Sequence, residues 1–497
     1  MPYKVNKVVI VGGGTSGWMA AATLAERYRQ HNLRIELIES DQISAVGVGE
    51  ATVPGLMRLH QNLGISEREF IKATNATFKL GIEFIDWHSI GQRFFHPFSA
   101  FGAPINGQPF YPCWLKSRDN GCAHELEAFS LSTAMARQGR FAQPDDEATN
   151  PLALYSYAYH FDATLYAQFL RKYAESRGVK RTEGKVTRVE NHASTGAITG
   201  VQLQQGAFIE GDLFIDCTGF TGVLIKQNLG VDFDDWSHWL PCDRAVVVQT
   251  QNTSAPLPYT QSIAREAGWQ WRIPLEQRKG NGLVYSSAYL SDDEAAGSLL
   301  KYVDGKLLTE PRQLRFKAGM RSVFWQYNCV ALGLSGGFIE PLESTSISLI
   351  QTGLEKLMQS MPELEVTESA VAQANRLNRA EYERIRDFII LHYKASGRRD
   401  TAFWRDVSAM DVPDTLTEKM CAFADDGRIL LGEQESFTEQ SWIALFHGLG
   451  LRPQSLPVSM QQLDSQKLTR MIDGMAHSIV LGAQCAPSHH EFLQTLD

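Results

Sequence analysis

Residues 8–39 read VVIVGGGTSGWMAAATLAERYRQHNLRIELIE, and their pattern predicts how the chain begins to fold. An apolar run ends at Val11 in three glycines, a helix-like segment follows from Trp18, and a second apolar run ends at Glu39. A strand, a glycine turn, a helix and a second strand in so short a span form a βαβ unit. The sequence therefore predicts an α/β fold that begins with a parallel sheet.

The glycine turn has the spacing G-x-G-x-x-G, and each glycine has its own task. Gly12 permits a tight turn, Gly14 lets backbone N–H groups approach a pyrophosphate, and Gly17 lets the helix pack closely on the sheet. Glu39 ends the next strand, where a carboxylate accepts hydrogen bonds from a ribose. Because a strand precedes the turn and a helix follows it, we interpret it as a dinucleotide site. The predicted contacts of the turn are Gly12, Gly14, Thr15, Ser16 and Gly17.

The pattern changes further along the chain. Aromatic residues, glycines and prolines dominate 94–121, which predicts an irregular or β-rich insertion, and much of 243–325 alternates as strands do. Beyond Thr345 the pattern becomes helical. We therefore expect an α/β core over 1–350, with an inserted β-sheet region at about 90–125 and 240–325, and a helical C-terminal region over 351–497 that completes the substrate site.

The composition excludes several classes of protein. With 43% hydrophobic and 21% charged residues the chain is typical of globular proteins, and a net charge of -9 argues against nucleic-acid binding. No apolar run reaches the roughly 18 residues of a membrane helix, and the first residues lack the features of a signal peptide. Seven cysteines without a CxxC pair fit reduced thiols. We expect a cytoplasmic protein without a membrane contact or a metal site.

Two later segments indicate which dinucleotide is bound. Asp216 ends an apolar strand, and the apolar run 329–332 leads into the glycines of 333–337. These resemble the second and third FAD-contacting segments of the glutathione-reductase-type flavoprotein monooxygenases, whose third segment usually reads Gly-Asp where this chain has Gly333 and Leu334. The resemblance implies a glutathione-reductase-type, Rossmann-like FAD core, with Asp216 and Leu334 at the cofactor.

Four further blocks resemble one family, the flavin-dependent tryptophan halogenases. Residues 269–274 read WQWRIP, the family's W-x-W-x-I-P signature, and 94–102 fit F-x-x-P-x-S-x-x-G. Residues 78–81 and 338–346 also match the family's own blocks. The segment 47–52 resembles the strap that lies over the flavin, which adds three expected cofactor contacts, Gly49, Glu50 and Ala51.

The resemblance implies the chemistry. Reduced FAD (FADH2), O2 and chloride or bromide give hypohalous acid, which a lysine guides to an electron-rich aromatic substrate. Lys79 matches that lysine, and its ammonium can donate a hydrogen bond to the acid, polarise the halogen or become an N-haloamine. The apolar neighbours Phe78, Leu80 and Ile82 argue against an ordinary surface lysine.

A base and a halide site are implied in the same way. Glu343 matches the glutamate that accompanies the lysine, and its carboxylate can stabilise the cationic intermediate, take its proton or orient the acid. Glu340 is the alternative. The backbone N–H groups of Thr345 and Ser346, where a helix begins, are suited to holding halide near the flavin.

Aromatic residues define the expected substrate region. Trp269 and Trp271 would ordinarily be core residues, but in this family they separate the flavin from the substrate. His96 and Phe98 match positions whose rings sandwich the substrate. The expected substrate and tunnel residues are His96, Phe98, Trp269, Trp271, Ile273, Pro274 and Trp442.

The C-terminal part bears on the identity of the substrate. Halogenases of free tryptophan carry a tyrosine-rich segment there, whereas 437–442 read FTEQSW without paired tyrosines. We therefore expect an indole-like substrate, with free tryptophan, another small arene, and a larger or carrier-bound substrate left open.

No second G-x-G-x-x-G for NAD(P)H is present, so we expect a separate NAD(P)H-dependent flavin reductase as partner. The resemblance also implies a homodimer as one option. Two other functions stay open. One is an aromatic hydroxylase of the same fold, against which the two tryptophans and the missing Gly-Asp argue. The other is a flavin-binding protein without turnover, against which Lys79 and Glu343 argue.

Overall fold

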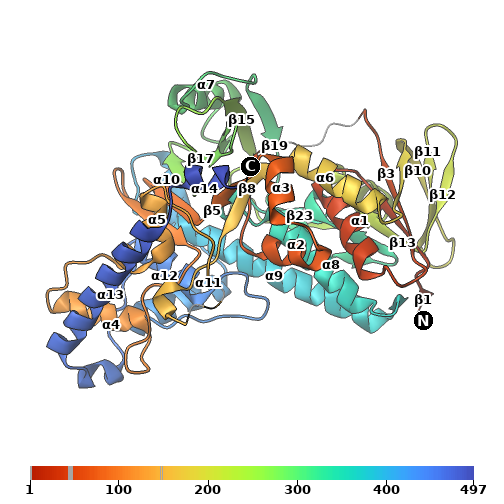
Figure 1. The fold of residues 1–497 in the computed structure, drawn as a ribbon. Helices are drawn as coiled ribbons and strands as arrows, with labels where there is room; N and C mark the ends of the chain where they lie inside the picture. The colour runs from red at the N-terminus through yellow and green to blue at the C-terminus, as the bar shows by residue number, and fades with distance from the viewer. Residues whose placement is uncertain (1–2, 43–48, 146, 148, 497) are drawn as a thin grey trace. The chain divides into compact units, whose positions relative to one another are not determined.

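The computed structural model describes residues 3–42, 49–145, 147 and 149–496 (Figure 1). The chain forms two compact units, each assembled from three segments. Unit 1 comprises Met1–Ala76, Phe161–Asp243 and Arg315–Glu383, and unit 2 comprises Thr77–His160, Arg244–Leu314 and Arg384–Asp497. This grouping differs from the boundary after residue 350 expected from the sequence, because the C-terminal helices pack with the insertions: α12 packs on β7 and α13 on α5.

Unit 1 contains a six-stranded sheet that is parallel except at one edge. Apolar runs form its inner strands because both faces are covered. The register pairs Val11 with Asp216 and with Ile38, so the carboxyl ends of three strands meet at one edge. The predicted α/β core is confirmed. In sheet order the strands are β21 Trp325–Gln326, β22 Cys329–Ala331, β13 Leu213–Asp216, β2 Lys7–Val11, β3 Arg34–Glu39 and β9 Lys180–Glu183.

Helix α1, Thr15–Arg27, follows β2 directly and packs on α6, Ala163–Glu175, and on α8, Ser346–Ser360. Asp162 caps α6 by accepting hydrogen bonds from the backbone N–H groups of Thr164 and Leu165. The remaining helices of unit 1 are α2 Gly55–Leu63, α3 Glu67–Thr74 and the first part of α9 Glu368–Lys394. Its other strands are β1 Tyr3–Lys4, β4 Gly49–Ala51, β10 Val186–Asn191, β11 Ile198–Leu203, β12 Phe208–Glu210, β14 Phe233–Asp235, β20 Gly319–Arg321, β23 Gly337–Phe338 and β24 Glu365–Val366.

Unit 2 is built on a seven-stranded sheet in which the W-x-W-x-I-P motif forms strand β17. Strands β16, β17 and β18 form an antiparallel meander. On its other side, β16 pairs in parallel with β6. The motif therefore lies inside a sheet with a paired strand on each side. In sheet order the strands are β19 Arg312–Arg315, β15 Arg244–Thr250, β18 Lys279–Tyr285, β17 Gly268–Pro274, β16 Thr260–Arg265, β6 Gly81–Ile85 and β7 Arg93–Pro97.

The helices of unit 2 include one that the sequence did not predict. Residues 94–121 were expected to be irregular or β-rich, but Phe110–Asp119 form helix α4. Pro112 lies in its first turn, where the missing N–H needs no partner, and Phe110 and Trp114 are buried one turn apart. The other helices are α5 Leu131–Arg137, α7 Asp292–Tyr302, the last part of α9, α10 Ala402–Ala409, α11 Asp414–Asp426, α12 Glu439–Gly448, α13 Ser465–Cys485 and α14 His489–Gln494.

Short helical turns complete the description: η1 Leu126–Phe129, η2 Pro151–Ala153, η3 Gly219–Thr221, η4 Val223–Asn228, η5 Gly333–Ser335, η6 Pro341–Glu343 and η7 Val458–Gln462. Within the described part of the chain, none of the helices combines the length and the apolar character that crossing a membrane requires.

Candidate active site

The glycine turn between β2 and α1 has the geometry of a dinucleotide site. Gly12 has φ +111°, and a Cβ there would lie 2.3 Å from the carbonyl oxygen of Cys217. A Cβ on Gly17 would lie 1.9 Å from the Gly12 carbonyl oxygen, so only glycine lets α1 approach the turn. Among the described residues, a Cβ on Gly14 would meet nothing within 4 Å, and no side chain caps this end of α1. The open space and the helix N–H groups fit a pyrophosphate.

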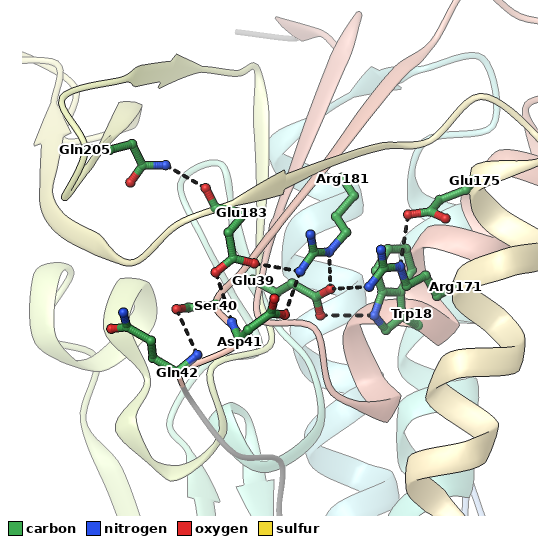
Figure 2. Close-up of polar contacts among 10 residues, drawn as sticks. All are labelled: Trp18, Glu39, Ser40, Asp41, Gln42, Arg171, Glu175, Arg181, Glu183 and Gln205. Carbon is green, nitrogen blue, oxygen red and sulfur yellow. Dashed lines mark hydrogen bonds and ion pairs between the residues drawn. The ribbon is translucent and has the colours of Figure 1, made fainter.

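The carboxylate of Glu39 lies over this turn and is held there by three donors (Figure 2). Arg181 Nε and Arg171 Nη1 donate to its Oε1, at 2.5 and 3.5 Å. Trp18 Nε1 donates to its Oε2 at 3.3 Å. A Cβ on Gly13 would lie 1.6 Å from that same Oε2. Oε2 therefore sits against the turn, where a ribose hydroxyl can donate to it.

The two arginines come from β9 and α6, far from the glycine turn in sequence. Arg181 also pairs with Asp41 at 2.8 Å and Glu183 at 2.6 Å, which fixes its guanidinium (Figure 2). The hydrogen bond to Glu39 raises the pKa of Arg181. Neither Arg171 nor Arg181 belongs to a motif, so sequence reasoning missed both.

Replacing Arg181 by glutamine is expected to weaken FAD binding by about tenfold, because the Glu39 carboxylate loses its strongest charged donor. Titration of flavin fluorescence or calorimetry measures this dissociation constant. Arg188→Gln is the matched control, since Arg188 is exposed and pairs only loosely with Glu190 at 3.5 Å. FMN lacks the adenosine ribose, and an equal loss for FMN contradicts the prediction.

The two later segments that are predicted to contact the cofactor meet at Asp216. Its buried carboxylate accepts hydrogen bonds from the backbone N–H groups of Thr218, Leu224 and Ile225, at 2.8–2.9 Å. Burial raises its pKa despite these bonds. The Asp216 carbonyl oxygen accepts a hydrogen bond from the hydroxyl of Ser335 in η5. The side chain therefore organises the loop after β13, and its predicted contact with FAD stays a prediction.

Leu334 lies in η5, directly after Gly333. A Cβ on Gly333 would lie 2.9 Å from Cβ of Ser16, so the third segment rests against the glycine turn. The structure thus brings Ser16 and the neighbourhood of Leu334 together within unit 1.

The strap predicted at 47–52 is described from Gly49 onward, and Gly47 and Val48 lie outside the described residues. Glu50 and Ala51 belong to β4. Burial raises the pKa of Glu50 to about 7, and the charge of Asp162 adds to this shift.

The segment from Glu340 to α8 forms a tight, buried turn. Glu340 and Glu343 are each 1% exposed, and Ser344 adopts the left-handed region at φ +61°. Helix α8 then begins at Ser346, with Thr345 at the N-cap position and no side-chain cap. The buried Oγ1 of Thr345 has no hydrogen-bond partner among the residues that the structure describes. This hydroxyl and the first N–H groups of α8 fit an anion.

Lys79 ends the short strand β5, Thr77–Lys79, which pairs with the first three residues of β8, Ala158–Asp162. Its side chain is 0% exposed, which excludes the surface lysine considered from the sequence. Its Nζ lies 5.3 Å from the centre of the Phe98 ring. The predicted lysine and one predicted substrate residue are therefore neighbours.

The two tryptophans of the motif are two residues apart in β17, so both side chains lie on the same face of the sheet. Trp269 and Trp271 are buried, with ring centres 6.0 Å apart. Gly282 on β18 pairs with Trp271, and a Cβ there would lie 2.2 Å from the indole. The indole of Trp271 thus packs against Gly282, where any larger residue would collide with it. Ile273 and Pro274 end the same strand.

An aromatic cluster surrounds His96 in unit 2. Its ring centre lies 6.4 Å from Phe98, 5.8 Å from Phe388 and 6.4 Å from Phe437. Phe388 and Phe437 stack at 3.7 Å, and Trp442 meets Phe388 edge-on at 4.8 Å. The sequence predicted His96, Phe98 and Trp442, whereas it gave no signal for the stacked pair.

The buried indole Nε1 of Trp442 has no hydrogen-bond partner in the described chain. The ammonium of Lys419 lies 4.4 Å from the centre of the Trp442 ring. A buried donor of this kind can bind an acceptor atom on a ligand.

The predicted residues are thus divided between the units. Unit 1 holds the predicted flavin contacts, Glu343 and the predicted halide residues, and unit 2 holds Lys79, both tryptophans of the motif and the aromatic cluster.

Comparison with known proteins identifies the family over most of the chain. A sequence model of the family described as tryptophan halogenase matches residues 7–465. The tryptophan 6-halogenase of Streptomyces toxytricini is 34% identical and covers 99% of this chain and 98% of its own length. The solved structure of a flavin-dependent halogenase from Brevundimonas sp. BAL3 superposes with a TM-score of 0.96 at 44% identity and covers 99% of both chains. A flavin-dependent halogenase from Xanthomonas campestris gives the same values.

Proposed function

This chain belongs to the tryptophan halogenase family and is a flavin-dependent halogenase, and on that premise we propose that Lys79 transfers the halogen to an indole-like arene. The observation that carries the proposal is the fully buried Lys79, with its Nζ 5.3 Å from the Phe98 ring. A buried ammonium beside an aromatic wall suits the handling of an electrophile away from water.

When bound, FADH2 with O2 and chloride or bromide would supply hypohalous acid. The turn from Gly12 to Gly17 would hold the pyrophosphate, Glu39 the adenosine ribose, and the segments at Asp216, Leu334 and 49–51 the rest of the cofactor. Thr345 and Ser346 would hold halide through the hydroxyl and the N–H groups at the start of α8.

Lys79 acts on the acid in one of two ways. As an ammonium it donates a hydrogen bond to the oxygen and weakens the O–halogen bond. As an amine its lone pair takes the halogen, and hydroxide leaves with a proton as water. In both cases the aromatic ring then attacks the halogen, and a base must take the ring proton. We assign the removal of this proton to the carboxylate of Glu343, with Glu340 as the alternative base.

The substrate is proposed to be indole-like. His96, Phe98, Phe388 and Phe437 offer flat apolar faces for an aromatic ring, and Trp442 offers a buried N–H donor. The relatives named above include a halogenase of tryptophan, but this chain lacks the paired tyrosines expected for free tryptophan. Trp269 and Trp271, with Ile273 and Pro274, would separate the substrate from the flavin.

A separate NAD(P)H-dependent reductase would supply FADH2, because the sequence has one G-x-G-x-x-G only. A cytoplasmic location is part of this proposal and rests on the odd, scattered set of cysteines. A homodimer is a further element, which light scattering in solution tests. Membership in the halogenase family argues against the hydroxylase alternative.

Mass spectrometry of reactions on a panel of indoles, phenols and tryptophan tests the proposal. The reactions contain a flavin reductase, NADH, FAD and equal chloride and bromide. The expected result is a halogenated indole whose formation requires halide. Oxygen incorporated without halide would support the hydroxylase, and a product from tryptophan alone would contradict the proposed substrate.

A further inference from the structure

His160 lies beside Lys79 on the same face of the antiparallel pair of strands β5 and β8. Strand β5 pairs with β8 so that Thr77 is opposite His160 and Lys79 is opposite Ala158. Residues directly opposite in an antiparallel pair share a face, so Lys79 and His160 are diagonal neighbours. Both side chains are fully buried, and the charge of Lys79 helps to lower the pKa of His160 well below its usual value, after burial itself.

The hydrogen bonds around His160 define one neutral tautomer. Thr77 Oγ1 donates its only proton to the carbonyl oxygen of Pro274, at 2.7 Å, because a carbonyl can only accept. The same Oγ1, 3.0 Å from His160 Nδ1, must therefore accept Nδ1–H. Nε2 is then left with a lone pair, which accepts a hydrogen bond from the hydroxyl of Thr260 at 2.9 Å.

A second histidine beside β5 is arranged in the same way. His489 Nδ1 lies 2.8 Å from the carbonyl oxygen of Pro256 and must carry the proton. Its Nε2 lone pair accepts the backbone N–H of Phe78, at 3.2 Å, next to Lys79 in the chain. Burial lowers the pKa of His489 to about 4. Each imidazole is thus neutral, with its basic nitrogen covered by a donor.

Covering this nitrogen matters because a neutral imidazole is a good acceptor of electrophilic halogen. Its lone pair would attack hypohalous acid, an N–halogen bond would form as the O–halogen bond breaks, and the Nδ1 proton would leave with hydroxide as water. A halogen on Lys79 could move in the same way, with the amine regaining the electron pair and the proton.

We propose that the Thr260 hydroxyl protects His160 from halogenation by occupying its Nε2 lone pair, so that the halogen is retained for Lys79 and the substrate. Thr260 and Thr77 are then positioning residues. The backbone N–H of Phe78 protects His489 in the same way, by occupying its Nε2 lone pair. The inference rests on the proposed function of Lys79.

Thr260→Val tests the inference, since valine keeps the shape of threonine without its hydroxyl, and Thr260→Ser is the matched control that keeps the donor. After turnover with bromide, N–halogen on the protein is measured by the thiol that it oxidises and located by peptide mass spectrometry before any reductant is added. The expected result is at least tenfold more bromine on His160 in Thr260→Val than in Thr260→Ser or the wild type, and product formation that declines with turnover.

Equal labelling of His160 in the valine and serine variants, while both still make product through Lys79, overturns the inference. Failure of the proposed function is detected by a different experiment: a Lys79→Met variant would then halogenate the substrate normally. If Thr260→Val does not fold, 15N NMR of the wild type decides the question. Protection requires that His160 stays neutral with its proton on Nδ1 between about pH 5 and 9, and an ordinary titration in this range overturns it.

Discussion

Lys79→Met is expected to lower halogenated product by about three orders of magnitude while FAD still binds. Methionine keeps the length and apolar stem of lysine but cannot donate a hydrogen bond to hypohalous acid or take the halogen as an amine. General acid–base and electrostatic assistance of this kind contributes about 100- to 10,000-fold. Liquid chromatography with mass spectrometry measures the product, and flavin fluorescence measures the bound cofactor.

Two further measurements sharpen this result. Hypohalous acid that Lys79→Met no longer uses should escape and oxidise a soluble thiol or halogenate an unselective trap. Lys116→Met is the matched control, because Lys116 is a half-buried lysine of unit 2 that donates at 2.6 Å to the carbonyl oxygens of Met460 and Leu463. Normal product from Lys79→Met would show that another group guides the halogen.

Glu343→Gln is expected to slow halogenation by about 100-fold, because a buried amide cannot take the ring proton. Loss of that proton should then limit the rate. A substrate deuterated at the reacting carbon should therefore react about two- to fivefold more slowly in this variant, with a smaller isotope effect in the wild type. Rates with the two isotopologues measure this directly.

Glu340→Gln is the matched control for this experiment. Both glutamates flank Pro341 and Leu342, and both are 1% exposed, so the two substitutions remove the same carboxyl group from equally buried sites. A large isotope effect in Glu340→Gln, and none in Glu343→Gln, would reverse the assignment.

Local pattern accounts for what the sequence predicted well. The run 8–39 encodes β2, α1 and β3 because each step depends on residues close in the chain. The close approach of Gly17 to Gly12, and the open space at Gly14, follow from the same local spacing. The buried state of Lys79 could be expected from its apolar neighbours.

Contacts between distant segments account for what the sequence did not reveal. Arg181 reaches Glu39 because β9 pairs with β3, and a strand pairing cannot be read from either segment alone. The contact between His160 and Thr260 likewise joins residues that lie 100 positions apart in the chain. Helix α4 escaped prediction because its aromatic residues and Pro112 are equally typical of a loop.

The order of strands in unit 1 has a consequence for biosynthesis. β13 lies between β2 and β22, which come from opposite ends of that unit's sequence. After β13 ends at Asp216, a ribosome adding about 5–20 residues per second needs roughly 6–23 seconds more to reach β22 at Cys329. Until then one edge of β13, an apolar strand, has no neighbour and can pair with other nascent chains. The yield of folded enzyme should therefore rise with slower initiation, lower temperature or chaperones that shield this edge.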